Sequence, residues 1–401
     1  MKIRPVILCG GEGTRLWPKS KNNQAKQFIN FGGWNLFEKT LERIKGKIFD
    51  YPIISTNSKY LKQVKKFLKK LKIKKYSIVL EPAKRNTAPA ILTATLIKNI
   101  PSKQPIMFFP SDHLIDNDKQ LKKAIEKNKR YLNNQNIFVF GIKPTSPSKE
   151  YGYFLTKSIG TNINKVSKFI EKPSETKAKK IIKNKGYWNS GMFLARKDSI
   201  INNFKKYQPA IYKNCLKSVL KGKFKQNIYR LNKSWFLAAK AKSFDYAILE
   251  KTKNINGIKL TISWTDLGNW REILKIYYKN KSKYFNKKNV YYRPWGRYVN
   301  LFEGKNFLVK ELVVNSKSSI SLQKHHYRSE HWMVTQGKPR ITVNKKKFFK
   351  KENDSIFIPV GTIHRIENLY KKPVKIMEAQ TGPILKETDI VRYKDVYGRL
   401  N

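Results

Sequence analysis

The stretch VILCGGEGTRLWP, residues 6–18, decides the fold of the first half of the chain. Its apolar start, Val6 to Cys9, is typical of a buried strand, and glycines follow at positions 10, 11 and 13. Glycines directly after a strand let backbone N–H groups approach a phosphate. The planar guanidinium group of Arg15 can donate two parallel hydrogen bonds to phosphate oxygens. The spacing differs from a Walker loop and from a dinucleotide fingerprint. Because a Gly-rich turn can also be purely structural, the prediction of a phosphate loop depends on the motifs farther along the chain.

Apolar runs and helical patterns alternate from this stretch onward. The predicted strands are Val6 to Cys9, Pro52 to Ser55, Ile78 to Leu80, Ile106 to Phe109 and Ile137 to Phe140. The predicted helices are Leu36 to Ile48, Tyr60 to Leu71, Ala88 to Ile97 and Leu121 to Leu132. This alternation predicts an α/β domain with a parallel, doubly wound sheet.

The pattern changes after about residue 285. Short strand-like runs separated by turn signals predict a small all-β barrel or jelly roll. These runs are Arg297 to Leu301, Phe307 to Val314, Ile320 to Gln323, Trp332 to Thr335, Arg340 to Val343, Ser355 to Pro359 and Val374 to Gln380. The Lys- and Asn-rich stretch 278–289 is the expected linker, so we predict domains at 1–285 and 286–401.

The composition limits where the protein works. The two cysteines, Cys9 and Cys215, are too few for a disulfide framework and fit a reducing compartment. The apolar run at the N-terminus is shorter than a signal peptide requires, and no run of about 18 apolar residues could span a membrane. We therefore expect a cytoplasmic protein without a membrane partner.

The formal charge of +58 raises the alternative of a nucleic-acid-associated protein. A dedicated nucleic-acid binder more often concentrates its charge in one arm or patch, whereas lysines here are spread along the whole chain. We favour solvated surface lysines, which can also attract phosphorylated substrates, and expect no specific nucleic-acid partner.

Polar motifs follow the predicted strands in chain order. They include Lys26-Gln27-Phe28, Glu81-Pro82, Arg85-Asn86-Thr87, Ser111-Asp112-His113, Tyr151-Gly152-Tyr153, Glu171-Lys172-Pro173, Trp188-Asn189-Ser190-Gly191 and Thr265-Asp266-Leu267-Gly268. In open α/β sheets, ligands bind outside the carboxyl ends of the strands. Asp112 follows the strand Ile106 to Phe109, where a carboxylate can hold Mg²⁺ against phosphates.

These blocks resemble the bacterial mannose-1-phosphate guanylyltransferases, in the bifunctional form fused to a mannose-6-phosphate isomerase domain. The resemblance covers nearly the whole chain. It implies a Rossmann-like, GT-A-like domain that transfers GMP from GTP to mannose 1-phosphate, with GDP-mannose and pyrophosphate as products. By this resemblance, the nucleotide is held by Gly10, Gly11, Gly13, Thr14, Arg15, Lys26, Asn86 and Ser111. Mannose 1-phosphate is held by Gly152, Glu171, Lys172 and Asn189, and Mg²⁺ by Asp112 and Asp266.

Such a transfer needs no protein nucleophile, because the sugar phosphate already carries an oxygen anion. Catalysis then rests on alignment and on neutralising charge at the α-phosphorus. Arg15, Lys26 and Lys172 are the candidates for this role, whereas His113 is expected to be structural or to support the site.

The last quarter of the chain contains four of its five histidines. Gln323-x-His325, Glu330 and a later Pro359-x-Gly361-x-x-His364 resemble the two halves of the cupin signature. Positions 323 and 325 share one face of a strand, so both side chains can reach one ion. Zn²⁺ or another divalent metal suits these ligands and could polarise the oxygens of a sugar phosphate during isomerisation.

The stretch 321–332 also looks like the isomerase domain of the bifunctional family. By that resemblance Gln323, His325, Glu330 and His364 are the metal ligands and mannose 6-phosphate is the substrate. Arg328 and Arg399 are candidates to grip the substrate, while His326 and His331 stay undecided between ligand neighbours and surface residues.

The chain departs from the family in length and leaves alternatives open. The family carries a further β-rich segment between the motif around Asp266 and the Arg-Pro-Trp-Gly motif at 293–296, and this segment is missing here. A nucleotidyltransferase for another sugar or base, with a cupin that only binds or dimerises, remains an alternative, and so does a homo-oligomer.

Overall fold

The computed structural model describes residues 1–11, 25–29, 34–158, 164–267, 290–304 and 306–398. These residues form two compact units, one ending at residue 267 and one beginning at residue 290. The predicted linker lies outside the described residues, so the boundary at residue 285 stays a prediction. Each unit has its own apolar core.

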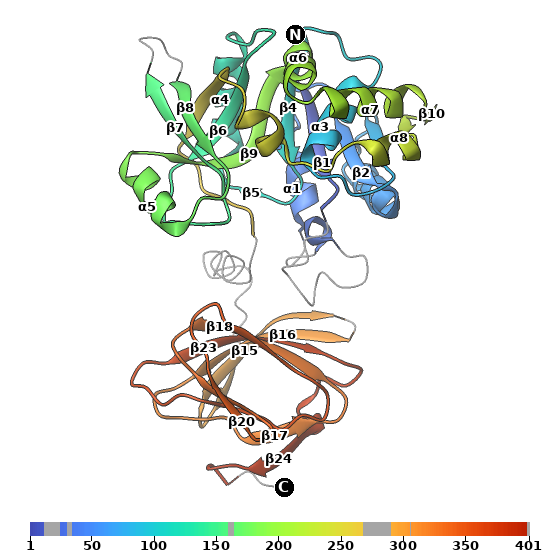
Figure 1. The fold of residues 1–401 in the computed structure, drawn as a ribbon. Coiled ribbons are helices and arrows are strands. Elements are labelled where there is room, and N and C mark those ends of the chain that lie inside the picture. The colour runs from blue at the N-terminus through green and yellow to red at the C-terminus, as the bar shows by residue number, and fades with distance from the viewer. Residues whose placement is uncertain (12–24, 30–33, 159–163, 268–289, 305, 399–401) are drawn as a thin grey trace. The chain divides into compact units, whose positions relative to one another are not determined.

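The first unit is built on an eleven-stranded sheet (Figure 1). In spatial order its strands are β10 (Lys223–Lys225), β11 (Ile228–Arg230), β3 (Ser77–Glu81), β2 (Ile53–Asn57), β1 (Arg4–Cys9), β4 (Pro105–Pro110), β9 (Tyr187–Arg196), β6 (Ile137–Ile142), β12 (Ile255–Leu260), β8 (Asn164–Ile170) and β7 (Tyr153–Ser158). A separate pair is formed by β5 (Leu114–Ile115) and β13 (Trp264–Thr265).

The predicted parallel sheet is present only in part. Strands β3, β2, β1 and β4 run parallel, as the apolar runs predicted. Strand β9 then pairs antiparallel with both β4 and β6, and β7 and β8 are also antiparallel. The sheet is therefore mixed, because β9 lies antiparallel between β4 and β6 and the neighbouring β7 and β8 form an antiparallel pair.

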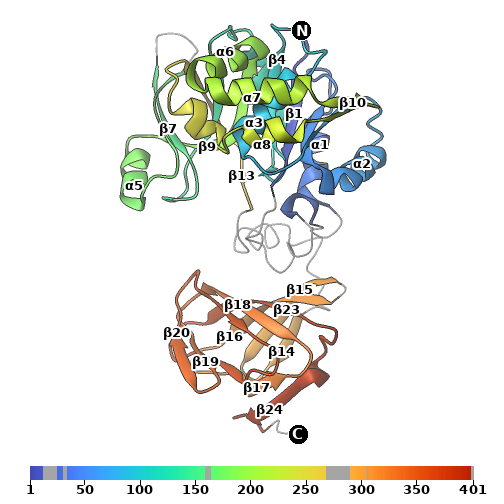
Figure 2. The ribbon, with the colours of Figure 1, turned by 45° about the vertical axis from the view of Figure 1, so that its right-hand side comes forward.

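Helices cover both faces of this sheet. One face is covered by α1 (Leu36–Arg43), α2 (Leu61–Lys70), α4 (Asp118–Lys129) and α5 (Glu175–Lys183). The other face carries α3 (Thr87–Leu96), α6 (Lys197–Tyr207), α7 (Pro209–Leu220) and α8 (Lys233–Ala238), which Figure 2 shows together. Helix α1 ends five residues before its predicted end at Ile48, since the chain turns at Gly46, where φ is +131°.

The second unit consists of two antiparallel sheets that face each other (Figure 1). One contains β14 (Val290–Arg293), β15 (Gly296–Gly304), β16 (Phe307–Val314), β23 (Val374–Thr381), β18 (Ser329–Gln336) and β21 (Ser355–Ile358). The other contains β20 (Lys346–Phe349), β19 (Arg340–Val343), β22 (His364–Glu367), β17 (Leu322–His325) and β24 (Ile390–Lys394). This arrangement is the predicted jelly roll.

In the described ranges, no helix has both the length and the apolar character needed to cross a membrane.

Candidate functional site

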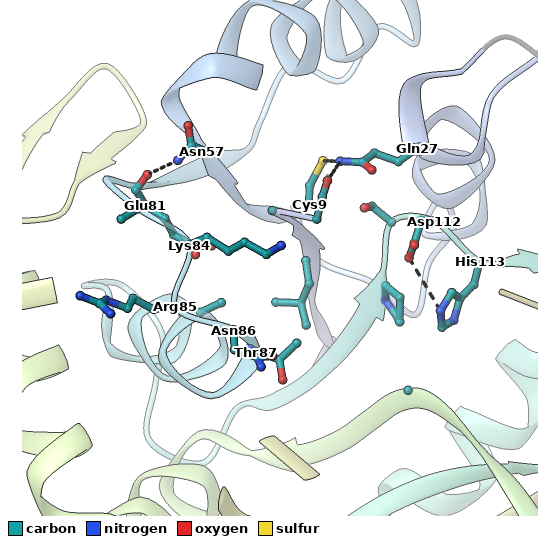
Figure 3. A pocket seen from close by; sticks show the side chains of 18 of the residues that line it. Cys9, Gln27, Asn57, Glu81, Lys84, Arg85, Asn86, Thr87, Asp112 and His113 are labelled. Carbon is teal, nitrogen blue, oxygen red and sulfur yellow. Dashed lines mark hydrogen bonds and ion pairs between the residues drawn. The ribbon is translucent and has the colours of Figure 1, made fainter. Parts of the chain in front are cut away.

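A cavity of about 430 Å³ lies where strands β1, β3 and β4 end. Gly10 and Gly11 follow β1, Glu81 ends β3, and Ser111 and Asp112 follow β4. In Figure 3, Glu81 and Lys84 lie on one side of the cavity, with Asp112 and His113 on the opposite side. The carboxyl ends of parallel strands thus bring together motifs about 100 residues apart in the sequence, as the strand pattern predicted.

The N-terminus of α3 forms another wall of this cavity. Asn86 caps the helix, since its Oδ1 accepts the Thr87 backbone N–H at 2.8 Å. Its backbone has φ 65° and ψ −176°, a combination that non-glycine residues rarely adopt and that often marks a functional site. The free N–H groups of a helix N-terminus favour an anionic ligand.

Glu81 is a feature of the cavity to which the sequence motif assigned no role. The Ser55 hydroxyl donates to its Oε1 at 2.7 Å, and burial raises the pKa of the carboxyl to about 7. The residue is 5% exposed and lines the cavity. The only signal in the sequence is the position of Glu81 at the end of a predicted strand.

Lys26 lies between the two aspartates of the predicted magnesium site. Its Nζ is 2.8 Å from Asp112 Oδ2 and also contacts the main-chain oxygen of Asp266. Tyr151 donates to Asp266 Oδ1 at 2.9 Å. Burial alone would raise the pKa of Asp112, but the Lys26 charge lowers it below its usual value. Two aspartates beside one displaceable ammonium group fit a site for a hard divalent ion.

His113 is held as a neutral ring beside this pair. The Trp264 indole N–H donates to its Nδ1 at 3.3 Å, so the ring proton is on Nε2, 3.7 Å from Asp112 Oδ1. Burial lowers the pKa of His113. This geometry supports the predicted supporting role.

The residues predicted to bind the sugar also come together. Asn189 lies on β9, its backbone N–H donates to the oxygen of Gly152 at 2.8 Å, and it is close to Glu171. A Cβ at position 152 would collide with Glu171 Oε2, so a larger residue there would force the Glu171 carboxyl group to move. Lys172 follows Glu171 with φ 46° and is exposed.

Two acidic residues that the sequence analysis did not single out complete this cluster. A π-helical turn at Asp245–Leu249 places Asp245 against Asn189, whose Nδ2 donates to Asp245 Oδ1 at 2.9 Å. Glu250 accepts the Glu171 backbone N–H at 3.0 Å. Burial raises the pKa of Glu171 to about 8 and that of Asp245 to about 6, and the charge of Glu250 adds to both shifts. Asp245 also lines the large cavity, so the two groups of residues form one site.

The second unit contains a compact cluster of ligand-type side chains. His325, Glu330 and His364 are buried, with one ligand atom of each within 4.8 Å of the others. His325 Nε2 is 3.1 Å from Glu330 Oε1, and His364 Nε2 is 3.6 Å from Glu330 Oε2. Ligand atoms of a tetrahedral zinc site are about 3.4 Å apart, given metal–ligand bonds of about 2.1 Å.

The protonation of both rings fits a metal ion. His325 Nδ1 lies 3.2 Å from the Asp389 carbonyl oxygen, and His364 Nδ1 lies 2.8 Å from that of Thr362. With the ring protons donated to these carbonyl groups, both Nε2 lone pairs face the Glu330 carboxylate, and within the described part of the chain the buried His364 Nε2 has no hydrogen-bond partner. The two lone pairs and the carboxylate repel one another, and a bound cation would remove this repulsion. Carbonyl groups that accept from the other ring nitrogen of ligating histidines are a usual feature of metal sites.

The remaining residues of the predicted site take different positions. Gln323 lies beside the cluster with Nε2 3.5 Å from His325 Nε2, and rotation of its amide would turn Oε1 inward while Ser321 accepts from Nε2. Arg328 is buried and donates to Glu330 and to the Lys386 carbonyl group. His326 is exposed and His331 half-buried, and neither belongs to the cluster. Gly13, Thr14, Arg15 and Arg399 lie outside the described residues.

The mixed sheet with a large cavity at its strand ends, followed by a jelly roll with a metal-type cluster, defines a nucleotidyltransferase carrying a cupin domain. The sequence profile of the nucleotidyl transferase family matches residues 4–283, and the profile of the mannose-6-phosphate isomerase C-terminal domain matches residues 279–395. The chain therefore belongs to the nucleotidyl transferase family, in the branch that carries this isomerase domain. The predicted resemblance is confirmed.

Relatives are similar over their whole length. The xanthan biosynthesis protein XanB of Xanthomonas campestris is 32% identical, with 99% of each chain covered. The mannose-1-phosphate guanylyltransferase RfbM of Salmonella typhimurium is 31% identical, with 99% of this chain and 98% of the relative covered. A solved mannose-6-phosphate isomerase of Helicobacter pylori has a TM-score of 0.58 at 28% identity and covers 66% of this chain and 100% of its own.

These relatives contain residues that this chain lacks. The alignment with XanB extends over 464 positions, whereas the chain has 401 residues. The greater length of the alignment agrees with the prediction that this chain lacks a segment of the family.

Proposed function

We propose that the first domain transfers GMP from GTP to mannose 1-phosphate, and that the cupin domain interconverts mannose 6-phosphate and fructose 6-phosphate. The observation that carries the proposal is Asp245, which lines the nucleotide-sized cavity and also belongs to the acidic cluster expected to bind the sugar. One continuous site of this kind suits a reaction that joins a nucleotide to a sugar phosphate. Relatives similar along their whole length include proteins named mannose-1-phosphate guanylyltransferase.

The cavity contains groups suited to guanosine triphosphate. The backbone at Gly10 and Gly11 and the α3 N-terminus at Asn86 can approach phosphate oxygens, and Ser111 also lines the cavity. Ionised Glu81 would accept the two adjacent N–H groups that guanine presents at N1 and N2. Adenine and the pyrimidines lack this pair of donors and would leave the buried carboxylate unpaired. Gly13, Thr14 and Arg15 remain candidates for the triphosphate.

The acidic cluster suits a hexose phosphate. Glu171, Asn189 and Asp245 offer hydrogen-bond partners for sugar hydroxyl groups, and Lys172 can neutralise the phosphate. Gly152 provides the space that Glu171 occupies. The raised pKa values of Glu171 and Asp245 let one carboxyl group donate to a hydroxyl while another accepts.

In the transfer, an oxygen of mannose 1-phosphate forms a bond to the α-phosphorus of GTP while the bond to the bridging oxygen breaks and pyrophosphate leaves. Asp112 and Asp266 would hold Mg²⁺, which neutralises phosphate charge when bound. The ammonium group of Lys26 lies beside the Asp112 carboxylate and can move from it to the phosphates. The protein therefore contributes alignment and charge.

In the cupin domain, Gln323, His325, Glu330 and His364 would hold Zn²⁺ or another divalent ion, which polarises the reacting oxygens of the sugar when bound. Arg328 donates to Glu330 and lies 3.4 Å from His325 Nε2, so it orients two of the ligands. It also lines a small cavity in the second unit. Arg399 remains a candidate to grip the substrate. We place both reactions in the cytoplasm, where the two buried free cysteines would stay reduced.

Two substitutions test whether each domain carries out only its own reaction. Asp266→Ala is expected to abolish pyrophosphate release while leaving isomerisation intact, and His364→Ala is expected to do the reverse. Both activities are measured on each purified, folded variant, with bound metal determined in parallel. Loss of both activities from either folded variant would show that the assignment of the two sites is wrong.

A further inference from the structure

Lys310 occupies a position in the cupin interior that normally holds an apolar side chain. It lies on β16, and the residues on the same face of that strand, Leu312 and Val314, belong to the apolar core. Lys310 is only 7% exposed. Removing an ammonium group from water is costly unless a partner compensates, so lysine is almost never fully buried without one.

The structure offers this ammonium group little compensation. Among the described residues, Lys310 Nζ makes no hydrogen bond or ion pair, and its contact is the ring of Tyr298, 4.6 Å from Nζ to the ring centroid. The nearest carboxyl groups have other donors. Glu378 accepts from Trp332 and Gln380, each at 3.2 Å, and Glu387 accepts from Tyr298 at 2.7 Å. The three N–H donors of Lys310 are therefore available to a ligand.

Lys310 belongs to the lining of a small cavity in the second unit, which reaches the metal-type cluster at Glu330. Lys310 lines this cavity together with Gln323 and Glu330. Its cross-strand neighbour is Glu378 on β23, and β23 pairs with β18, which carries Glu330. Arg392 lines the same cavity, and its buried Nε has no hydrogen-bond partner among the described residues. Glu378 and Glu387 also line the cavity, and their charges interact with Lys310, but neither forms an ion pair or a hydrogen bond with it. Cationic donors without hydrogen-bond partners beside a metal site favour an anionic ligand.

We propose that Lys310 binds the phosphate group of the hexose phosphate and so positions the sugar for reaction at the metal cluster. This inference rests on the isomerase half of the proposed function. A phosphate at C6 is remote from the reacting C1 and C2, so a separate cation must hold it while the metal ligands hold the other end. The alternative, a counter-ion that only offsets the charges of Glu378 and Glu387, gives Lys310 no role in substrate binding, and the kinetics of Lys310 variants separate the two.

The test compares Lys310→Met with the wild-type chain in the isomerase reaction. The variant is expected to lower kcat/KM for mannose 6-phosphate by at least about tenfold, mainly through KM, as loss of one charged hydrogen bond predicts. Inorganic phosphate, used as a competitive inhibitor, should lose affinity by a similar factor. Lys310→Arg should recover part of both, while Lys346→Met, on the exposed strand β20, should change neither.

Metal content and pyrophosphate release separate the outcomes. Both should match the wild type in Lys310→Met. A fall in kcat with unchanged KM and unchanged phosphate inhibition would overturn the proposal, as would loss of bound metal. If Lys310→Met does not fold, Lys310→Arg and Lys310→Gln decide by the same criterion. A wild-type chain without isomerase activity would instead contradict the proposed function.

Discussion

At the scale of single residues, the chemistry of the nucleotide site depends on buried carboxyl groups whose neighbours set their charge. Burial raises the pKa of Glu81 to about 7, whereas Lys26 keeps the pKa of Asp112 low despite burial. The pKa values of these two carboxyl groups are therefore shifted in opposite directions within one cavity. Each shift implies a specific response to pH or to a metal ion.

GTP binding is expected to strengthen between pH 6 and pH 8. In the proposed complex guanine donates to ionised Glu81, and a carboxyl group with a pKa of about 7 is mostly protonated at pH 6 and mostly ionised at pH 8. Glu81→Gln should remove this dependence and weaken GTP binding by about 10- to 100-fold.

The measurement is titration of GTP into the protein without mannose 1-phosphate, so that the sugar site does not contribute. ATP serves as the control ligand because its phosphates titrate in the same range, and Glu126→Gln, at an exposed position on α4, is the matched variant. Equal pH profiles for GTP and ATP would show that Glu81 does not contact the base.

Lys26→Met is expected to raise the affinity of the free protein for Mn²⁺ several-fold while lowering the rate of transfer. The ammonium group of Lys26 lies 2.8 Å from Asp112 Oδ2 and competes with a divalent ion for that carboxylate. Electron paramagnetic resonance of free Mn²⁺ measures the affinity, with Lys39→Met, an exposed lysine on α1, as control. Weaker Mn²⁺ binding by Lys26→Met would mean that Lys26 supports the metal site rather than competing with it.

At the scale of elements, strand ends and one π-helical turn bring the site together. Gly152 precedes β7 and lies against Glu171, which follows β8. We expect Gly152→Ala to lower kcat/KM for mannose 1-phosphate by about 10- to 100-fold, because a small displacement of a positioning residue is costly. GTP binding should not change.

A second substitution makes this prediction specific. Shortening Glu171 to Asp in the Gly152→Ala chain relieves the contact and should recover part of the loss. Steady-state kinetics with mannose 1-phosphate measures both variants. Unchanged kinetics in Gly152→Ala would show that Glu171 does not bind the sugar.

The elements that the sequence predicted are those with strong local patterns. The apolar runs of β1, β3 and β4 identified the parallel core of the sheet and therefore the place of Asp112. The resemblance to the cupin signature led to the prediction of His325, Glu330 and His364 as ligands, and the structure brings these three together. Alternation along a strand explains only why positions 323 and 325 share a face.

The missed features depend on contacts distant in the sequence. Asp245 accepts a hydrogen bond from Asn189, which lies 56 residues earlier in the sequence. A π-helical turn places Asp245 there, and the sequence carries no periodic signal for such a turn. Strand β20, Lys346–Phe349, is exposed throughout and lysine-rich, so no apolar alternation indicated it. The antiparallel return of β9 is likewise set by pairing on both sides rather than by its own residues.

At the scale of the whole molecule, two units with separate cores hold separate chemistry. Stripping the cupin metal with a chelator, then removing the chelator and restoring only Mg²⁺, should abolish isomerisation and leave pyrophosphate release intact. Two buried histidines facing a carboxylate without a metal should also destabilise the second unit. Thermal denaturation, with metal content measured on the same samples, should show one lowered transition. Loss of transfer together with the cupin metal would contradict this independence.

The most direct test of the proposed transfer is pyrophosphate release by the purified protein with Mg²⁺ and mannose 1-phosphate, compared across GTP, ATP, CTP, UTP and dTTP. We predict release with GTP well above that with any other nucleotide, since ionised Glu81 matches guanine alone. Release with dTTP but not GTP, or no release with any nucleotide from a folded chain, would contradict the proposed function.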